Sequence, residues 1–275
     1  MRVAYQGEPG AFSEAGTIDY FGPETITVAQ DRFDGVFRAV NTGQCEAGFI
    51  PIENSRAGSI HENYDLLAEN QLYITGEYYL RVRHCLIGLP GVTISDIRLV
   101  ISHPQALNQC RNSIKGFGIE TYEPVYDTAG AVKMIAEKAE RTTAAIASRR
   151  AAELYGMDIL AEGIEDDASN YTRFLVIERQ PVVVREDAKT TLMFCLKNQP
   201  GALFKALSAF ALRDIDLTKI ESRPLMGKPW EYLFYIDLAG STEDAKVSRA
   251  LENLGEFATM LRVLGSYRRH KLFAP

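Results

Sequence analysis

The sequence predicts an α/β protein made of two domains, and three observations carry that prediction. Over residues 1–180 short apolar runs alternate with helical patterns of about 10–15 residues, which is typical of strands connected by helices. Residues 179–189 are polar and charged and contain a proline, which indicates a linker. After the linker, strands and helices follow in the order βαββαβ, the order of a ferredoxin-like domain.

The first domain is expected to span residues 1–180 and to form two lobes, one from residues 1–76 with 171–180 and the other from residues 77–170. Its expected strands are Arg2–Gln6, Glu46–Pro51, Ile97–Ser102, Thr143–Ala147 and Thr172–Ile177. Its expected helices are Phe12–Phe21, Ser59–Ala68, Pro104–Ile114, Gly130–Lys138 and Arg149–Leu154. Two further strands are expected where the chain crosses into the second lobe, Leu72–Thr75 and Tyr79–Cys85.

The second domain is expected over residues 188–267. Its four expected strands are Thr190–Leu196, Asp216–Arg223, Glu231–Leu238 and Ala258–Val263. A helix opened by Pro200 is expected at Leu203–Leu212, and a second helix at Glu243–Leu254.

Composition restricts the class of protein. The 275 residues are 46% hydrophobic and 24% charged, close to an average globular protein, and the net charge of −6 argues against a nucleic-acid binder. The four cysteines lie far apart without CxxC spacing, which predicts free thiols and no metal site. We see no signal or transit peptide and no apolar run near ~18 residues, so we expect a cytoplasmic protein with no membrane span.

Polar residues stand where the predicted strands of the first domain give way to helices. Ser102 and Ser148 each follow a strand, and Asp127–Thr128 stands before another helix. The N-terminus of a helix presents unpaired backbone N–H groups and the positive end of a dipole, which suits anions. Because ligands of open α/β sheets bind at the carboxyl ends of the strands, these turns predict a small anionic ligand in a cleft.

Longer motifs resemble those of the prephenate dehydratase family. In the first domain they are Gly7–Ser13, Pro51–Ser55, Gly58–Ile60, Glu62–Leu67, then Ser102–Leu107 with Gln109 and Cys110, and the threonine–arginine–phenylalanine signature in Asn170–Phe174. In the second domain Asn198–Leu203 and Glu221–Pro224 are similar to the phenylalanine-binding motifs of the family's ACT domain. The resemblance covers essentially the whole chain, in order.

The resemblance implies a fold and a reaction. The fold is a two-lobed, periplasmic-binding-protein-like catalytic domain followed by an ACT regulatory domain. The reaction is that of a carbon–oxygen lyase of phenylalanine biosynthesis: prephenate loses its ring hydroxyl and ring carboxylate and becomes phenylpyruvate. Because aromatisation drives this step, no cofactor and no metal is expected, and catalysis depends on orientation and a placed proton donor.

Two other functions remain open at this point. Arogenate dehydratases do the same chemistry on the aminated substrate, and the motifs do not separate the two. A two-lobed binding protein with a sensor domain and no catalysis is the alternative of a different class. Because the chain opens directly on the first dehydratase strand, we do not expect the chorismate mutase domain that some relatives carry.

The resemblance assigns catalysis first to Thr172, whose hydroxyl can donate to the departing oxygen. Glu53 is the second catalytic candidate, as an acid whose pKa a dianionic substrate would raise. His103 is a third candidate for the general acid. Arg173 can pair with a substrate carboxylate, but strand alternation points Thr172 and Arg173 to opposite faces. Other residues expected to bind the substrate are Asn54, Ser102, Gln109, Asn170, Thr128 and Ser148.

The second domain is expected to bind phenylalanine as a feedback effector. Backbone N–H groups of Gly201, Ala202 and Leu203 would hold the amino-acid carboxylate at a helix start. The remaining candidate residues are Glu221, Ser222 and Arg223, which in related ACT domains lie near a subunit interface. We therefore expect a homodimer or homotetramer with an effector site shared between subunits.

Overall fold

The computed structural model describes residues 1–225 and 230–271. The chain divides into two compact units: a first unit of Met1–Ser59 with Tyr79–Phe174, and a second unit of Ile60–Tyr78 with Leu175–Pro275. Residues Ile60–Tyr78 thus group with the C-terminal part of the chain. The domain and lobe boundaries expected from the sequence stay a prediction.

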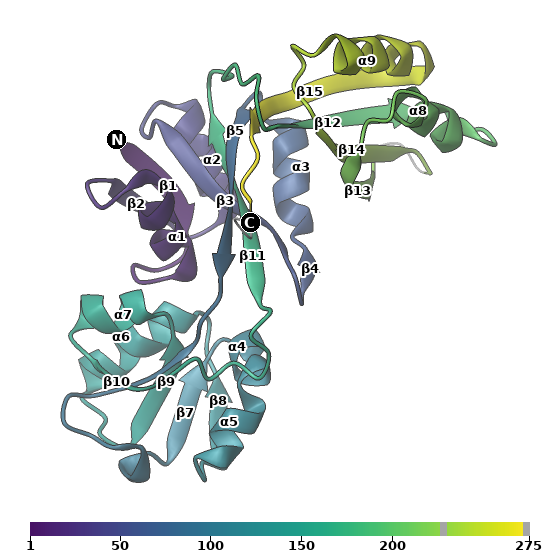
Figure 1. Ribbon diagram of the computed structural model, residues 1–275. Coiled ribbons are helices and arrows are strands. Elements are labelled where there is room, and N and C mark those ends of the chain that lie inside the picture. Colours follow the sequence, from purple (N-terminus) through teal and green to yellow (C-terminus); the bar gives the residue numbers. More distant parts are fainter. Residues whose placement is uncertain (226–229, 272–275) are drawn as a thin grey trace. The chain divides into compact units, whose positions relative to one another are not determined.

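The N-terminal lobe of the first unit is a parallel sheet with helical crossovers (Figure 1). Strand β1 (Arg2–Gln6) lies between β2 (Ile26–Gln30) and β3 (Ala47–Asn54) and is parallel to both. The crossovers are α1 (Phe12–Phe21) and α2 (Phe33–Asn41), and the short β4 (Gly58–Ser59) folds back antiparallel on β3. Phe49 of β3 stacks on Phe174 with ring centroids 4.6 Å apart, and both side chains are buried in the core of this lobe.

The other lobe of the first unit is a five-stranded sheet in the order β10-β6-β9-β7-β8. Its strands are β6 (Cys85–Gly88), β7 (Leu99–Ser102), β8 (Thr121–Pro124), β9 (Thr143–Ala147) and β10 (Asp158–Glu162). Strands β8, β7 and β9 are parallel, whereas β6 pairs antiparallel with both β9 and β10. The helices are α4 (Pro104–Gln109), α5 (Arg111–Gly116), α6 (Thr128–Lys138) and α7 (Arg149–Tyr155), with a 3-10 turn at Ile94–Asp96.

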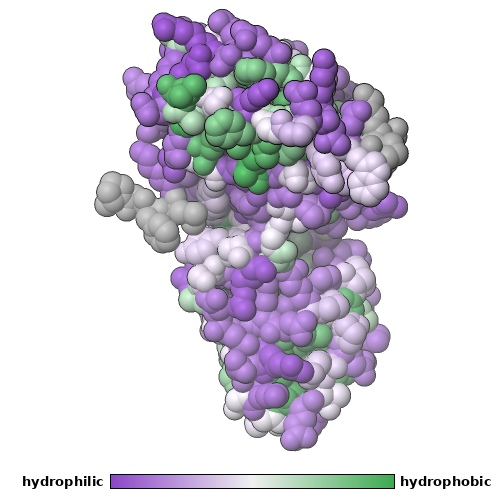
Figure 2. Space-filling model, turned by 90° about the vertical axis from the view of Figure 1, so that its right-hand side faces the viewer, coloured by the Kyte–Doolittle hydropathy of each residue, from purple (hydrophilic) through white to green (hydrophobic). Residues whose placement is uncertain are grey.

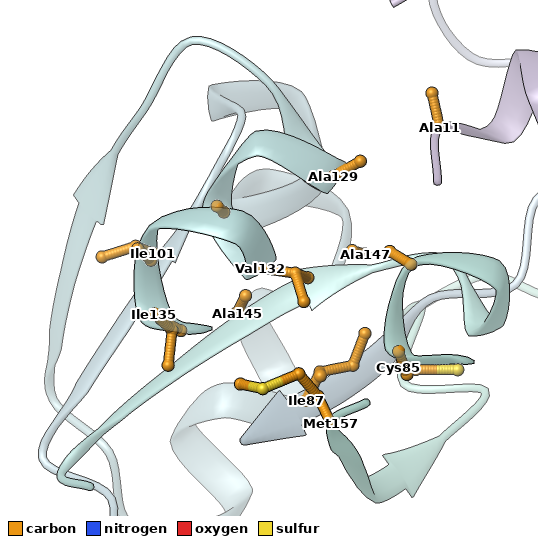
Figure 3. Close-up of a cluster of buried hydrophobic side chains, with 13 residues drawn as sticks. Ala11, Cys85, Ile87, Ile101, Ala129, Val132, Ile135, Ala145, Ala147 and Met157 are labelled. Carbon is orange, nitrogen blue, oxygen red and sulfur yellow. The ribbon is translucent and has the colours of Figure 1, made fainter. Parts of the chain in front are cut away.

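Small residues set how closely α6 packs on this sheet. Val132 and Ile135 of α6 face Ala145 of β9 in a buried cluster (Figure 3), and Ala145 and Ala147 expose no surface. Alanine on the strand lets the helix approach at the density typical of protein cores. The packing fixes the start of α6, where the Asp127 carboxylate accepts the Gly130 N–H at 2.9 Å.

Two local expectations were wrong. The expected strands Leu72–Thr75 and Tyr79–Cys85 are replaced by one strand, β5 (Tyr73–Arg81), because Glu77 is buried and its charge is paired. The expected helix Pro104–Ile114 is two helices separated at Cys110. There the Gln109 carbonyl accepts the Asp166 N–H at 2.7 Å, and the Asp166 carboxylate accepts the Asn112 N–H at 3.1 Å, so a tertiary contact replaces helical bonds.

The second unit contains the expected βαββαβ arrangement. Its strands are β12 (Ala188–Leu196), β13 (Leu217–Pro224), β14 (Tyr232–Ala239) and β15 (Ala258–Arg268), paired antiparallel in the order β13-β14-β12-β15. Helices α8 (Ala202–Ala211) and α9 (Ala245–Phe257) share one buried cluster with this sheet. The ferredoxin-like prediction is confirmed.

Helix α3 (His61–Glu69) also packs within the second unit. Its Asp65 carboxylate accepts two hydrogen bonds from Arg223 (3.0 and 2.7 Å), and the Tyr235 hydroxyl donates to the Tyr64 carbonyl at 2.6 Å. Elsewhere on this unit Phe204, Leu212 and Ile220 are exposed, and Figure 2 shows hydrophobic side chains gathered on its surface. Strand β11 (Tyr171–Glu178) then leads from the first unit into the second.

Candidate active site

A cavity of about 170 Å³ lies in the first unit, where polar and apolar residues of both lobes meet. Its lining combines the end of β3, the start of β11, the segment after β5 and the starts of α1, α4 and α6. The lining residues are Phe12, Ser13, Pro51, Asn54, Val82, His84, His103, Gln105, Ala106, Gln109, Thr128, Asn170, Thr172 and Phe174. Among the described residues, the lining includes neither lysine nor arginine.

Helices α1 and α6 both begin at this cavity. Phe12 and Ser13 begin α1, and Thr128 begins α6. The first backbone N–H groups of a helix lack partners inside the helix, and the dipole there favours negative charge. Because the Asp127 carboxylate already accepts the Gly130 N–H at the start of α6, the start of α1, which has no side-chain cap, is the helix end left for a small anion.

Asn54 organises the hydrogen bonds on one wall. Its Oδ1 accepts the backbone N–H groups of Arg56 and Ala57, both at 3.0 Å, which fixes the orientation of the amide. Its Nδ2 donates to Asn170 Oδ1 at 2.9 Å and to Thr172 Oγ1 at 3.0 Å. The end of β3 and the start of β11 are thereby held together.

The geometry determines which way the Thr172 hydroxyl points its proton. Because an amide nitrogen has no lone pair to offer, Thr172 Oγ1 must be the acceptor in its bond with Asn54. The Thr172 hydroxyl hydrogen has no acceptor within the part of the chain that the structure describes. It is available to donate to a ligand in the cavity.

Gln109 and His84 also line the cavity, and a hydrogen bond links Gln109 to Asn170. Asn170 Nδ2 donates to Gln109 Oε1 at 3.1 Å, and His84 Nε2 lies 2.9 Å from that same oxygen. All three side chains are buried. Burial lowers the pKa of His84, an effect that the hydrogen bond with Gln109 opposes. His84 was missed in the sequence, where one histidine at the end of an apolar run gave no signal beyond a strand terminus.

Glu53 and Arg173 contact each other, and neither is among the residues that line the cavity. The Arg173 Nη1 lies 3.4 Å from Glu53 Oε1, and the Arg173 side chain is 3% exposed. Its guanidinium also lies over the Tyr79 ring, 5.9 Å from the centroid. Strand alternation separates them from Asn54 and Thr172, as the sequence indicated for Thr172 and Arg173.

Ser102 and Ser148, two of the predicted substrate-binding residues, use their hydroxyl groups in hydrogen bonds within the fold. The Ser102 hydroxyl is buried and donates to the Ile146 carbonyl at 2.6 Å, and Ser102 does not line the cavity. The Ser148 hydroxyl donates to the Gly10 carbonyl and accepts the Ala151 N–H, so it caps α7. Ser148 borders a different hollow of about 440 Å³. Helix capping uses the same residue types as anion binding, and the sequence pattern does not distinguish them.

Thr128 and His103, by contrast, do line the cavity. Thr128 is half-buried at the first position of α6. His103 is exposed, and its Nδ1 accepts the Gln105 N–H at 3.3 Å, which caps α4. Within residues 1–225 and 230–271, no group of three or more histidine, cysteine or acidic side chains is close enough to hold a metal ion.

The expected effector residues fall into two places in the second unit. Ala202 and Leu203, at the start of α8, line a hollow of about 140 Å³ together with Trp230 and Phe234. Gly201 is the N-cap of α8 and has a positive φ of 76°. The other group faces α3: Glu221 pairs with His61 at 3.3 Å, and Arg223 pairs with Asp65, whereas Ser222 is exposed.

The fold is a two-lobed α/β unit with a cavity large enough for a small ligand, followed by a ferredoxin-like domain. The family model described as prephenate dehydratase matches residues 3–182, and the model described as ACT domain matches residues 190–256. The chain belongs to the prephenate dehydratase family. The predicted family and fold class are therefore confirmed.

Characterised relatives are similar over nearly the whole chain. The protein named arogenate dehydratase/prephenate dehydratase 2, chloroplastic, of Arabidopsis thaliana is 48% identical over 97% of this chain and 72% of its own length. Arogenate dehydratase 2 of Petunia hybrida is 46% identical over 97% of this chain and 71% of its own length.

Two solved structures share the complete architecture. The prephenate dehydratase of Arthrobacter aurescens, in complex with L-Phe, is 31% identical and has a TM-score of 0.90, covering 98% of this chain and 90% of its own. A structure described as GqqA, a novel type of quorum quenching acylase, is 37% identical with a TM-score of 0.92, covering 98% of both chains. In the described part of this chain, none of the helices is long and apolar enough to cross a membrane.

Proposed function

We propose that this protein removes water and carbon dioxide from prephenate to give phenylpyruvate, and that phenylalanine inhibits it. The observation that carries the proposal is the Thr172 hydroxyl, which accepts from Asn54 and keeps its proton for the cavity. Near it, the start of α1 has no side-chain cap and offers backbone N–H groups to a carboxylate of the substrate.

The reaction can be written with these groups. The bond from the ring to its carboxylate breaks and releases CO2, and its electron pair enters the ring. The ring carbon opposite loses its hydroxyl, which takes a proton from Thr172 as it leaves as water. Solvent returns a proton to Thr172, so one proton is consumed overall. Donation from Asn54 to Thr172 Oγ1 polarises the hydroxyl and strengthens it as a donor.

Substrate contacts are proposed for the residues that line the cavity. Gln109, Asn170 and Thr128 border it, and Asn54 holds Thr172 in place. Glu53 and Arg173 support the same two strands from the other face through their ion pair. The role proposed for Glu53 and Arg173 is therefore positional, and Thr172 remains the proposed proton donor.

Arogenate is the alternative substrate, because an amino group replaces only the keto oxygen of its side chain. Both plant relatives at 46–48% identity carry arogenate dehydratase in their names. The test is to assay purified protein with prephenate and arogenate side by side, with and without phenylalanine. Turnover of either acid supports the dehydratase proposal and identifies the substrate. Inertness toward both would overturn it and make acylase activity the next one to assay.

The proposed effector site is the start of α8. Ala202 and Leu203 line a hollow that also contains aromatic side chains, and the Arthrobacter aurescens relative is described with L-Phe bound. Backbone N–H groups at the helix start would bind the carboxylate, and the aromatic side chains would contact the ring. Glu221, Ser222 and Arg223 would complete the site with a second subunit.

Replacing Gly201 by valine is expected to weaken inhibition by phenylalanine strongly while turnover stays close to wild type. A β-branched residue is strained at a φ of 76°, so the cap of α8 and its N–H groups would shift. The inhibitory concentration should rise by about 5- to 150-fold, the usual range of allosteric coupling. Gly255 of α9 is the matched control, because Gly255→Ala meets open space and should leave the inhibition curve unchanged. An unchanged curve for Gly201→Val would move the effector site elsewhere.

We also propose a homodimer or homotetramer in the cytoplasm. The exposed side chains of Phe204, Leu212 and Ile220 support association, since large apolar groups gather at subunit interfaces. All four cysteines are buried and free, which fits a reducing compartment. Light scattering of the purified protein tests the oligomeric state.

A further inference from the structure

His84 is a buried titratable group for which the proposed reaction has no use. It stands between β5 and β6, its side chain borders the catalytic cavity, and the residue is 2% exposed. Its ring packs edge-on against Phe12, with centroids 5.3 Å apart. Its Nε2 is hydrogen-bonded to Gln109, and its buried Nδ1 has no hydrogen-bond partner among the described residues.

The hydrogen bonds around Gln109 have one possible direction. Backbone N–H groups fix Asn54 Oδ1 as an acceptor, so Asn54 Nδ2 donates to Asn170 Oδ1. Asn170 Nδ2 must then donate to Gln109 Oε1. Because an oxygen cannot donate, His84 Nε2 must carry a proton and donate to that same oxygen.

The direction of these hydrogen bonds determines which half of the Gln109 amide can contact a ligand. Its Oε1 is occupied by two donors, and its Nε2 has no partner in the described part of the chain. Gln109 borders the cavity, so its amino group is the half of the amide left for the substrate. If the Gln109 amide were rotated by 180°, its oxygen would face the anionic substrate. Its amino group would then face the donors of His84 and Asn170.

We propose that His84 is a positioning residue: its Nε2–H holds the Gln109 amide so that the amino group faces the substrate. This inference rests on the proposed function. It assigns His84 no contact with the reacting atoms. Burial keeps the imidazole neutral near pH 7, so the proton on Nε2 leaves Nδ1 as a bare acceptor.

Variants of His84, alone and in a Gln109→Leu background, test the proposal. His84→Phe keeps the shape but removes the donor, and should lower kcat/KM by about 10- to 100-fold, mainly through KM, as expected for one hydrogen bond to a charged group. His84→Gln can place an amide nitrogen near the Nε2 position and should restore most of the loss. His84→Asn is shorter and should not. In a Gln109→Leu background, His84→Phe should have no further effect, because the two residues act as one unit.

The outcomes that overturn the proposal are distinct. An unchanged kcat/KM for His84→Phe, or equal losses with and without Gln109, would reduce His84 to packing. If His84→Phe fails to fold, the comparison of His84→Gln with His84→Asn carries the test, and equal activities would overturn it. Nitrogen-15 NMR of the histidine ring needs no turnover: a proton on Nδ1 and none on Nε2 would contradict the proposal. Failure of the proposed function would instead appear as inertness of the wild-type protein toward both prephenate and arogenate.

Discussion

Replacing Thr172 by valine is expected to lower kcat by about two to four orders of magnitude, the range for loss of a positioned proton donor. Valine has nearly the same shape as threonine and keeps the branched carbon of β11, so the strand is retained. The loss falls on the hydroxyl, whose proton is the one directed to the cavity. Rapid-quench or steady-state kinetics with the preferred substrate measures the change.

Substrate binding by Thr172→Val should be close to wild type, because the substrate carboxylate is proposed to be held by the start of α1. Asn54 Nδ2 loses one acceptor but keeps Asn170 Oδ1 and the Tyr171 carbonyl, so stability should fall by only about 1 kcal/mol. Thr172→Ser is the matched control, since it restores a hydroxyl at the same position and should recover much of kcat. A near-normal kcat for Thr172→Val would exclude Thr172 as the proton donor.

The sequence predicted the frame of this site because two local rules were sufficient. Period-two alternation placed Thr172 and Arg173 on opposite faces of one strand, and the structure pairs them with Asn54 and Glu53 respectively. Chain order and turn chemistry were enough to expect helix starts around a cleft. Strand alternation and turn chemistry both depend on residues that are close in the sequence, so a sequence pattern is enough to predict them.

What the sequence could not predict depends on partners far away along the chain. Ser102 and Ser148 have the chemistry of anion ligands, yet their hydroxyls donate to the carbonyls of Ile146 and Gly10. The break at Cys110 needs Asp166 to take over helical bonds, a contact between distant segments. The role proposed for His84 depends on its hydrogen bond with Gln109, which in turn is bonded to Asn170.

The second large effect is expected from the buried ion pair of the second unit. Lys189 Nζ of β12 lies 2.7 Å from Glu77 Oε2 of β5, and the two side chains are 3% and 0% exposed. Glu77 Oε1 also accepts the His270 N–H at 3.1 Å. Both carboxylate oxygens are therefore bonded, which is the condition under which a buried charge pair is tolerated.

Replacing Lys189 by methionine is expected to lower the free energy of unfolding by about 3–5 kcal/mol, because Glu77 would be left as a buried charge without its cation. Urea unfolding of wild type and variant measures the difference. Lys271, which pairs with Asp187 at the surface, is the control: Lys271→Met should change stability by less than about 1 kcal/mol.

A double variant separates the charge from the packing. Lys189→Met combined with Glu77→Gln removes both charges and keeps an acceptor for the His270 N–H, so it should recover part of the loss seen with Lys189→Met alone. Glu77 lies in the gap between the two strands expected from the sequence, and β5 runs through that gap. If the double variant were as unstable as the single one, side-chain packing around Lys189 rather than the ion pair would hold β12 to β5, and the continuity of β5 would need another cause.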